Sequence, residues 1–379
     1  MNLIARHYAT GQPIEVELAD GKIAAIQSID AEQTDLPWIA PGLIDIQING
    51  FGGPDFDNPA MDRQGWIAIV NLLAARGVTT FFPTFCTNSR ENFVAALARY
   101  AQLMDDPVLA HMMPGMHIEG PYISDDDGPR GAHDRRYTRD PSMEEIDAFD
   151  RASGNRLRIL TLAPERNGAI AVIRELARRG VAVAIGHTGA TSEQLDAAVA
   201  AGARFCTHLG NGAHTMMNRH RNYVFDQMAD DRLWATVIPD GHHLPRPLFN
   251  IMLRAKGLQR LVFVSDASGP AGLPAGRYGS RDLTPAGRLQ VADHPEFLSG
   301  SAISLDMGVG RAVALAGLTL AQSIDLATIQ PARLMGLADR GRLEAGAAAD
   351  LVLFDWDASA CQMTVRDTMV LGTKMENGY

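Results

Sequence analysis

Short apolar stretches of strand length alternate with amphipathic stretches of helix length from Pro41 onward. Eight stretches are predicted as strands: Leu43–Ile48, Val78–Phe82, Met112–Ile118, Leu157–Leu162, Val181–Ile185, Ala203–Cys206, Trp234–Ile238 and Leu261–Val264. Helix-like runs lie between most of them, for example Trp66–Ala75, Phe93–Leu103, Ile170–Arg178 and Leu248–Ala255. This alternation of strands and helices predicts an α/β fold, a (β/α)8 TIM-type barrel. A doubly wound open sheet is the alternative, but no Gly-x-Gly-x-x-Gly turn follows the first strand.

The two ends of the chain instead show the period-two alternation of half-buried strands. Near the N-terminus, Ile14–Leu18 and Lys22–Ile26 flank a turn at Asp20 and Gly21, and strand-like runs recur at 346–354 and 363–370. Because a lone hairpin is marginally stable in water, we expect the ends to pack together. The prediction is a small β-sandwich domain from residues 1–40 and 341–379 beside a barrel domain at 41–340.

Polar residues follow the predicted barrel strands at the point where each strand stops. His187 and His208 end two strands that are joined by one predicted helix, for which Thr191 is a plausible N-cap and Gln194 completes a capping box. Parallel strands joined in this way place both carboxyl ends at the same edge, so the two imidazoles should lie side by side. Glu119 ends another such strand. One carboxylate and two imidazoles form a ligand set for one divalent metal ion with an open position, although each histidine alone is more often structural.

Asp266 follows the eighth predicted strand and is the candidate catalytic base. It could be only a helix cap or an ion-pair partner, but beside a metal it would take a proton from water and pass it to a leaving group. His133 and His243 fall in loops after the third and seventh strands, where a substrate contact and a solvated loop residue are equally plausible. Other histidines, among them His111 and His214, carry no positional signal and are expected to be structural or exposed.

The charge, the cysteine spacing and the apolar stretches of the chain limit the partners and the compartment that can be expected. The chain of 379 residues has a formal net charge of −10, which disfavours nucleic-acid or anionic-membrane partners. Its three cysteines, Cys86, Cys206 and Cys361, are widely spaced and read as free thiols in a reducing compartment. No stretch has the length of a signal peptide's apolar region or of a membrane span, so a cytoplasmic protein is expected.

The pattern resembles the amidohydrolase superfamily, and within it the N-acetylglucosamine-6-phosphate deacetylase family. The most specific segments are Gly115-Met-His-Ile-Glu-Gly-Pro121 and Leu298-Ser-Gly-Ser301. Further resembling segments occur in order along nearly the whole chain: 41–50, 161–165, 186–188, 207–209, 240–243, 264–267, 331–334 and 341–350.

The resemblance implies metal-dependent deacetylation of N-acetylglucosamine 6-phosphate or a related N-acetylhexosamine, releasing acetate and an amino sugar phosphate. It implies that Glu119, His187 and His208 bind the metal, that Asp266 is the acid and base, and that His133 could stabilise the developing oxyanion. Zinc is the expected ion, with Fe²⁺, Co²⁺ and Mn²⁺ as alternatives. Gln47 and Asn49 stand where many superfamily members have two further histidines, so one metal is expected.

The resemblance also implies a set of substrate contacts and a homodimer. Family members use an arginine of the neighbouring subunit to reach the sugar phosphate, within a motif that this chain alters. Arg219 or Arg221 could replace that arginine, and His243 fits a family histidine near the phosphate. The expected substrate contacts are Asn211, Gly212, Arg219, Arg221, His243 and Leu298.

Two other functions stay open. One is hydrolysis of an unphosphorylated N-acetyl sugar or of another amide. The other is sugar binding without catalysis, although such a relative would be expected to lack Asp266 or a metal ligand, and none is missing.

Overall fold

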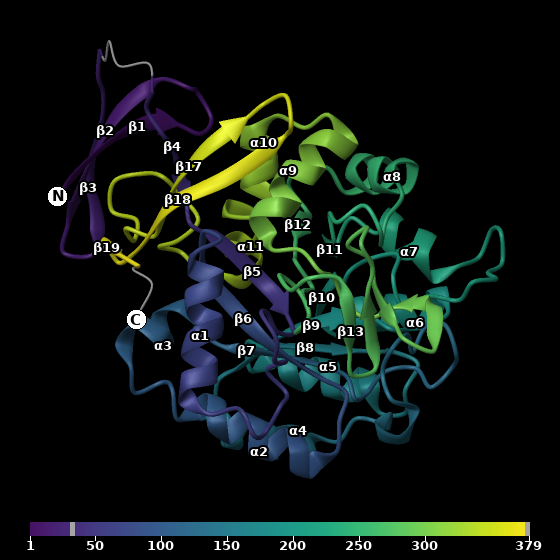
Figure 1. Ribbon diagram of the computed structural model, residues 1–379. Coiled ribbons are helices and arrows are strands. Elements are labelled where there is room, and N and C mark those ends of the chain that lie inside the picture. The colour runs from purple at the N-terminus through teal and green to yellow at the C-terminus, as the bar shows by residue number, and fades with distance from the viewer. Residues whose placement is uncertain (31–34, 376–379) are drawn as a thin grey trace.

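A parallel eight-stranded sheet forms the centre of the protein in the computed structural model, which describes residues 1–30 and 35–375 (Figure 1). Its strands follow chain order: β5 (Leu43–Ile48), β6 (Val78–Cys86), β7 (Met116–Glu119), β8 (Leu157–Leu162), β9 (Ala182–Ile185), β10 (Ala203–Cys206), β11 (Trp234–Val237) and β12 (Leu261–Phe263). The first and last strands meet, because the backbone N–H of Asp266 donates to the carbonyl of Gln47 at 2.9 Å. The N–H of Ser265 likewise donates to the Asp45 carboxylate at 3.2 Å. The predicted barrel is therefore confirmed.

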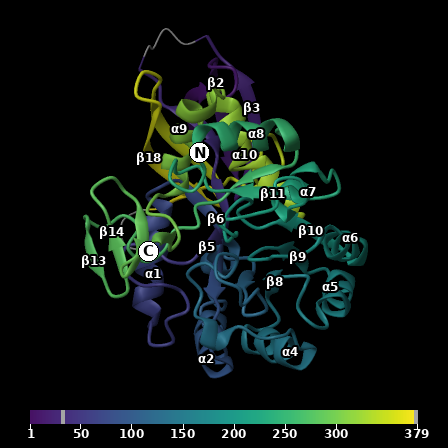
Figure 2. The same cartoon turned by 90° about the vertical axis from the view of Figure 1, so that its right-hand side faces the viewer.

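Helices cover the outside of this barrel, as the side-on view shows for α4, α5 and α6 beside β8, β9 and β10 (Figure 2). The helices are α1 (Arg63–Ala74), α2 (Arg90–Ala101), α3 (Pro107–Met112), α4 (Met143–Ala152), α5 (Ala169–Arg178), α6 (Ser192–Ala201), α7 (Tyr223–Ala229), α8 (Arg246–Lys256), α9 (Leu305–Ala316), α10 (Leu320–Leu326) and α11 (Ile329–Met335). The last of them, α11, packs Ala332 and Leu334 against the apolar interior of the barrel. Helix α6 begins with the predicted capping box of Thr191 and Gln194. No helix in the described part of the chain is both long enough and apolar enough to cross a bilayer.

The barrel strands are buried on both faces, which explains why they read as nearly continuous apolar runs. Ile44, Phe82, Ile159 and Phe205 pack inside the barrel, while a larger apolar layer lies between the strands and the helices. Side chains thus fill the barrel's interior. Only the ends of the strands can carry polar groups that face a ligand.

Both chain termini contribute to a separate seven-stranded sheet, drawn in purple and yellow in Figure 1. Its order is β19 (Thr373–Lys374), β18 (Gln362–Val370), β17 (Leu351–Asp357), β4 (Trp38–Pro41), β1 (Asn2–His7), β2 (Pro13–Ala19) and β3 (Lys22–Ser28). Strand β4 joins the two ends, since it pairs parallel to β1 and antiparallel to β17. The terminal β-domain is confirmed as part of the fold. Residues 31–34 and 376–379 of its predicted range lie outside the described residues.

Two details of the predicted elements are wrong. The third barrel strand starts at Met116 and not at Met112, because the apolar run 108–113 belongs to α3, and Pro114 and Gly115 separate that helix from the strand. A four-stranded antiparallel sheet was not predicted: β13 (Gly276–Tyr278), β14 (Arg281–Leu283), β15 (Leu289–Val291) and β16 (His294–Leu298). These strands are short and largely exposed, so they carry no clear apolar alternation.

Candidate active site

A cavity of about 640 Å³ opens at the carboxyl ends of the barrel strands. This volume lies within the range of roughly 300–1,000 Å³ that is typical of small-molecule sites. Most of the residues predicted from the sequence line it: Glu119, His133, His187, His208, Asn211, Gly212, His243, Asp266 and Leu298. The barrel therefore brings together side chains that are far apart in the chain.

Glu119, His187 and His208 converge on a common point. Oε1 of Glu119 lies 3.2 Å from Nε2 of His187 and 2.9 Å from Nε2 of His208, and the two Nε2 atoms are 3.1 Å apart. All three side chains are buried. Although burial acts to raise it, the neighbouring imidazoles of His187 and His208, whose Nε2 atoms lie within hydrogen-bond distance of Oε1, hold the pKa of Glu119 well below its usual value. The carboxylate is thus charged at neutral pH.

The hydrogen bonds of His187 show that this group fits a cation. Its Nδ1 lies 2.9 Å from the carbonyl oxygen of Pro129, which can only accept, so Nδ1 carries the proton. In the neutral ring the lone pair is then on Nε2, the atom that faces Glu119 Oε1. Two lone pairs that face each other need a positive charge between them. A carbonyl that holds the second ring nitrogen is also the usual partner of a metal-binding histidine.

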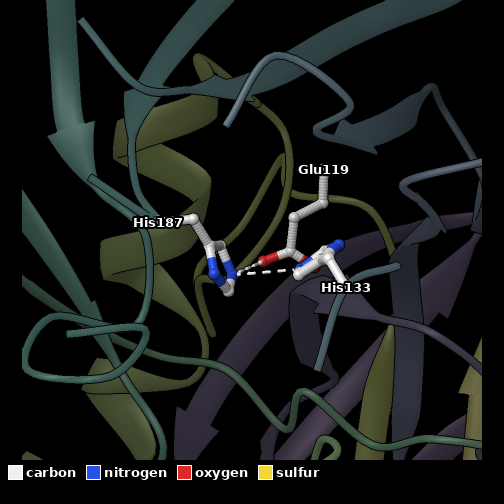
Figure 3. A group of neighbouring side chains, drawn as sticks. All are labelled: Glu119, His133 and His187. Carbon is white, nitrogen blue, oxygen red and sulfur yellow. Dashed lines mark hydrogen bonds and ion pairs between the residues drawn. The ribbon is translucent and has the colours of Figure 1, made fainter. Parts of the chain in front are cut away.

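His133 extends the same group from the other side (Figure 3). Its Nε2 lies 3.2 Å from Nε2 of His187, and the ligand atoms of Glu119, His133 and His187 are all within 4.8 Å of one another. Burial and the neighbouring His187 lower the pKa of His133 to about 3, so its imidazole is neutral at pH 7. Geometry alone leaves His133 in reach of a metal and of a substrate.

Asp266 lies beside this group and is held by two neutral amides. Nδ2 of Asn49 donates to Oδ1 of Asp266 at 2.8 Å, and Nε2 of Gln47 donates to the same oxygen at 3.3 Å and to Oε1 of Glu119 at 2.8 Å. Burial and the nearby charge of Glu119 raise the pKa of Asp266 to about 6. A carboxyl with such a pKa can both accept and release a proton near neutral pH.

The backbone is strained at three of these residues. His187, His208 and Asp266 have φ angles of +52°, +29° and +47°, in the left-handed region that non-glycine residues rarely adopt. Each lies two or three residues after the end of a barrel strand. Such strain persists only when surrounding contacts enforce it, and it is concentrated at functional sites.

Two predicted substrate residues do not reach the cavity within one chain. Arg219 and Arg221 are exposed on the loop between β10 and α7 and are absent from the lining of the cavity. Met216 on the same loop is 88% exposed. In contrast, His243 lines the cavity and its Nδ1 lies 2.7 Å from Asp240 Oδ2, which fixes the ring.

Several residues that line the cavity were not predicted as site residues, among them Asp57, Cys86, His214 and Arg281. His214 was expected to be structural or exposed, but its backbone N–H and its Nδ1 both contact the hydroxyl of Tyr223, which holds it in the cavity wall. Arg281 lies on the unpredicted sheet and pairs with Asp55 at 2.6 Å. Cys86 ends β6, four residues beyond the point where the predicted strand stops. The other three lie away from the ends of the barrel strands, so only a search of the remaining polar residues could have suggested them.

Comparisons with known proteins agree with this arrangement. The model of the amidohydrolase family matches residues 38–375. The chain is 33% identical over 347 residues to an N-acetylgalactosamine-6-phosphate deacetylase of Escherichia coli O157:H7, which covers 90% of both chains. It is 33% identical over 349 residues to an N-acetylglucosamine-6-phosphate deacetylase of Danio rerio, which covers 89% of this chain and 84% of that protein.

A solved structure shares the whole architecture. The N-acetyl-D-glucosamine-6-phosphate deacetylase of Mycobacterium smegmatis superposes with a TM-score of 0.87 at 29% identity, over 99% of both chains. The match of the family model over most of the chain, together with these relatives, identifies the family: the chain belongs to the amidohydrolase family.

Proposed function

We propose that this protein is a metal-dependent deacetylase of an N-acetylhexosamine 6-phosphate, releasing acetate and the amino sugar phosphate. The observation that carries the proposal is the convergence of Glu119, His187 and His208 on one point beside Asp266, inside a cavity of small-molecule size. The relatives named above act on N-acetylglucosamine 6-phosphate and N-acetylgalactosamine 6-phosphate, which supports this substrate class.

Glu119, His187 and His208 would hold one divalent ion, with zinc as the proposed metal because of its preference for mixed nitrogen and oxygen ligands. When bound, such an ion polarises an amide carbonyl and lowers the pKa of water. The amide groups of Gln47 and Asn49 donate to carboxylates, so they are already engaged as hydrogen-bond donors. This supports one ion in place of two.

Asp266 would accept the proton of the attacking water and return it to the leaving amine. Both amide donors bond to its Oδ1, and within the described residues no hydrogen bond engages Oδ2, which leaves that oxygen for proton transfer. A pKa of about 6 lets the carboxylate predominate at pH 7 while its acid form stays accessible.

His133 would face the reacting carbonyl. Its neutral ring offers one N–H donor, which could stabilise the negative charge that develops on the carbonyl oxygen. Asn211, Gly212, His243 and Leu298 would contact the sugar from the cavity wall.

We further propose a homodimer in which Arg219 or Arg221 reaches the phosphate bound by the neighbouring subunit. Their exposure on a loop outside their own cavity supports this arrangement. The three cysteines are free, which supports a reducing compartment such as the cytoplasm.

The test is a paired assay of metal content and acetate release. Purified protein reconstituted with zinc should contain one ion per chain and release acetate from N-acetylglucosamine 6-phosphate or N-acetylgalactosamine 6-phosphate. Unphosphorylated N-acetylglucosamine should react with a much lower kcat/KM. Equal rates on both sugars would remove the phosphate from the proposal, and no acetate from any N-acetylhexosamine would refute the deacetylase function.

A further inference from the structure

The loop between β7 and η1 (Arg135–Tyr137) is closed by one arginine. Arg130 donates from Nη1 to the carbonyl of His133 at 2.6 Å and from Nη2 to the carboxylate of Asp127 at 2.5 Å. Its side chain is 18% exposed, whereas the carboxylate of Asp127 is 71% exposed. The guanidinium therefore ties the two ends of the segment 127–133 together from within. One planar side chain with several fixed donors can hold both partners at once.

The segment between these two anchors lies against His187. The carbonyl of Pro129 holds Nδ1 of His187 at 2.9 Å, and Gly131 lies beside the ring, where a Cβ would be in ordinary van der Waals contact with Cε1 at 3.5 Å. His133, at the end of the segment, lies 3.2 Å from the other ring nitrogen. The loop thus sets the tautomer of one proposed metal ligand and carries the proposed oxyanion donor.

His208 offers an internal contrast. Its Nδ1 is buried and has no hydrogen-bond partner among the described residues, so no loop carbonyl sets the orientation of its ring in this way. Of the two histidines in the proposed metal site, His187 is the one whose lone pair at Nε2 depends on a contact outside the barrel. Displacement of Pro129 would free the proton to move to Nε2, and a protonated Nε2 cannot bind a cation.

We propose that Arg130 is a positioning residue for the metal site: by closing the loop 127–133 it fixes the His187 tautomer and the place of His133. This inference rests on the proposed function and deepens it. Arg130 does not line the cavity, so it acts through the carbonyl of Pro129 and through His133 and not by contact with substrate.

The experiment compares Arg130→Met, Arg130→Lys and Arg130→Ala with Arg136→Met. Arg136 is a matched control, because it also pairs with an aspartate of this region, Asp134 at 2.5 Å, but is 77% exposed. Zinc affinity is measured by competition with a chelator, kcat and KM by acetate release, and thermal unfolding on the metal-free proteins. Arg130→Met should displace the carbonyl of Pro129, the partner of His187, and so weaken zinc binding by roughly 10- to 100-fold, the usual effect of losing an outer partner of a metal ligand.

The lysine and alanine variants separate positioning from general destabilisation. Arg130→Lys keeps the charge, but its single ammonium group can bond well to only one of the two partners, the His133 carbonyl or the Asp127 carboxylate. Its zinc affinity should therefore lie between those of the wild type and Arg130→Met. Added guanidinium ion should restore part of the zinc affinity and kcat of Arg130→Ala and leave Arg136→Met unaffected. The metal-free variants should unfold at wild-type temperatures.

Wild-type zinc affinity in Arg130→Met would overturn the proposal, as would equal losses in Arg136→Met. A loss that guanidinium does not reverse and that tracks a lowered unfolding temperature would assign Arg130 to folding alone. Zinc affinity is measured without substrate. If the wild type released no acetate, the proposed function would fail while the role of Arg130 in the metal site would still be decided.

Discussion

At the scale of single residues, the site depends on pairs of groups that hold each other in one protonation state. Pro129 places the proton of His187 on Nδ1, and Gln47 donates to both Glu119 and Asp266. The neighbouring imidazoles hold the pKa of Glu119 well below its usual value against the effect of burial, whereas burial and the charge of Glu119 raise the pKa of Asp266 to about 6. Carboxyl groups whose pKa values are driven apart can take different roles, one as a permanent anion and one as a proton carrier.

Replacement of Asp266 by Asn tests the proton carrier. The amide fills the same volume but cannot carry a proton, so zinc content should stay at the wild-type level while kcat falls by about 10²- to 10⁴-fold. The measurements are metal analysis and steady-state acetate release. Asp105→Asn, an exposed position, serves as the control and should change neither quantity. Near-normal turnover in Asp266→Asn would remove the assigned role.

The variants His208→Ala and His133→Ala distinguish a metal ligand from a hydrogen-bond donor to the substrate. His208→Ala should lose both metal and activity, because it removes one of the three converging ligand atoms. His133→Ala should keep the metal and lose mainly kcat, because its proposed donor acts on the transition state. Metal analysis of both proteins checks this. Zinc lost from His133→Ala but retained in His208→Ala would make His133 the ligand.

At the scale of elements, the site is formed by loops that follow different barrel strands. The unpredicted sheet β13 to β16 forms one wall, and it is fastened to the loop after β5 by Arg281, whose Nη1 donates to Asp55 Oδ2 and whose Nε donates to Ser299. Asp55 also accepts from the backbone of Gly269, after β12. Three distant segments are thereby joined where Leu298 and its neighbours line the cavity.

The exposed loop between β10 and α7 is the element proposed to bind phosphate in trans. Arg219→Ala or Arg221→Ala should raise KM about tenfold or more for a phosphorylated sugar and leave KM for the unphosphorylated sugar unchanged, because only a charge-assisted contact to phosphate is lost. Arg204→Ala, an exposed position outside the loop, is the control.

Dimers mixed from two variants test directly whether the arginines of one subunit bind the phosphate held by the other subunit. Chains with Asp266→Asn keep both arginines, and chains with both arginines replaced keep Asp266, so mixing them should restore a low KM at the sites that retain Asp266. No recovery on mixing would mean that the arginines act within one chain or not at all.

At the scale of the whole molecule, the C-terminal part of the chain is tied to the barrel by a polar network. His111 at the end of α3 lies 2.7 Å from Asp350, and Arg340 donates to the carbonyl of His111 at 2.5 Å and to Thr80 of β6 at 3.0 Å. Because Thr80, Arg340 and Asp350 are buried and the His111 side chain is only 11% exposed, each polar group needs its partner. The barrel and the terminal sheet should therefore unfold as one cooperative unit.

Metal removal tests how the site is linked to this unit. A metal that binds only the folded state adds about 2.7 kcal/mol at a free concentration 100 times its Kd, so chelation should lower the unfolding temperature and zinc should restore it. Calorimetry with and without zinc measures the shift. His208→Ala is the control and should show no zinc-dependent stabilisation. An equal shift in that variant would place the stabilising zinc elsewhere.

The amino-acid sequence by itself determined the barrel, the pairing of the termini and the proposed metal ligands with Asp266. These follow from local periodicity, and parallel strands necessarily gather their carboxyl ends at one edge, where His187 and His208 stand. Only the tertiary structure decided which loops fold over that edge. Three features depend on contacts between distant, short or exposed segments. They are the closure of the loop 127–133 by Arg130, the wall formed by β13 to β16, and the position of Arg219 and Arg221 outside the cavity. Such segments carry no periodic pattern, because neither face of them is regularly buried.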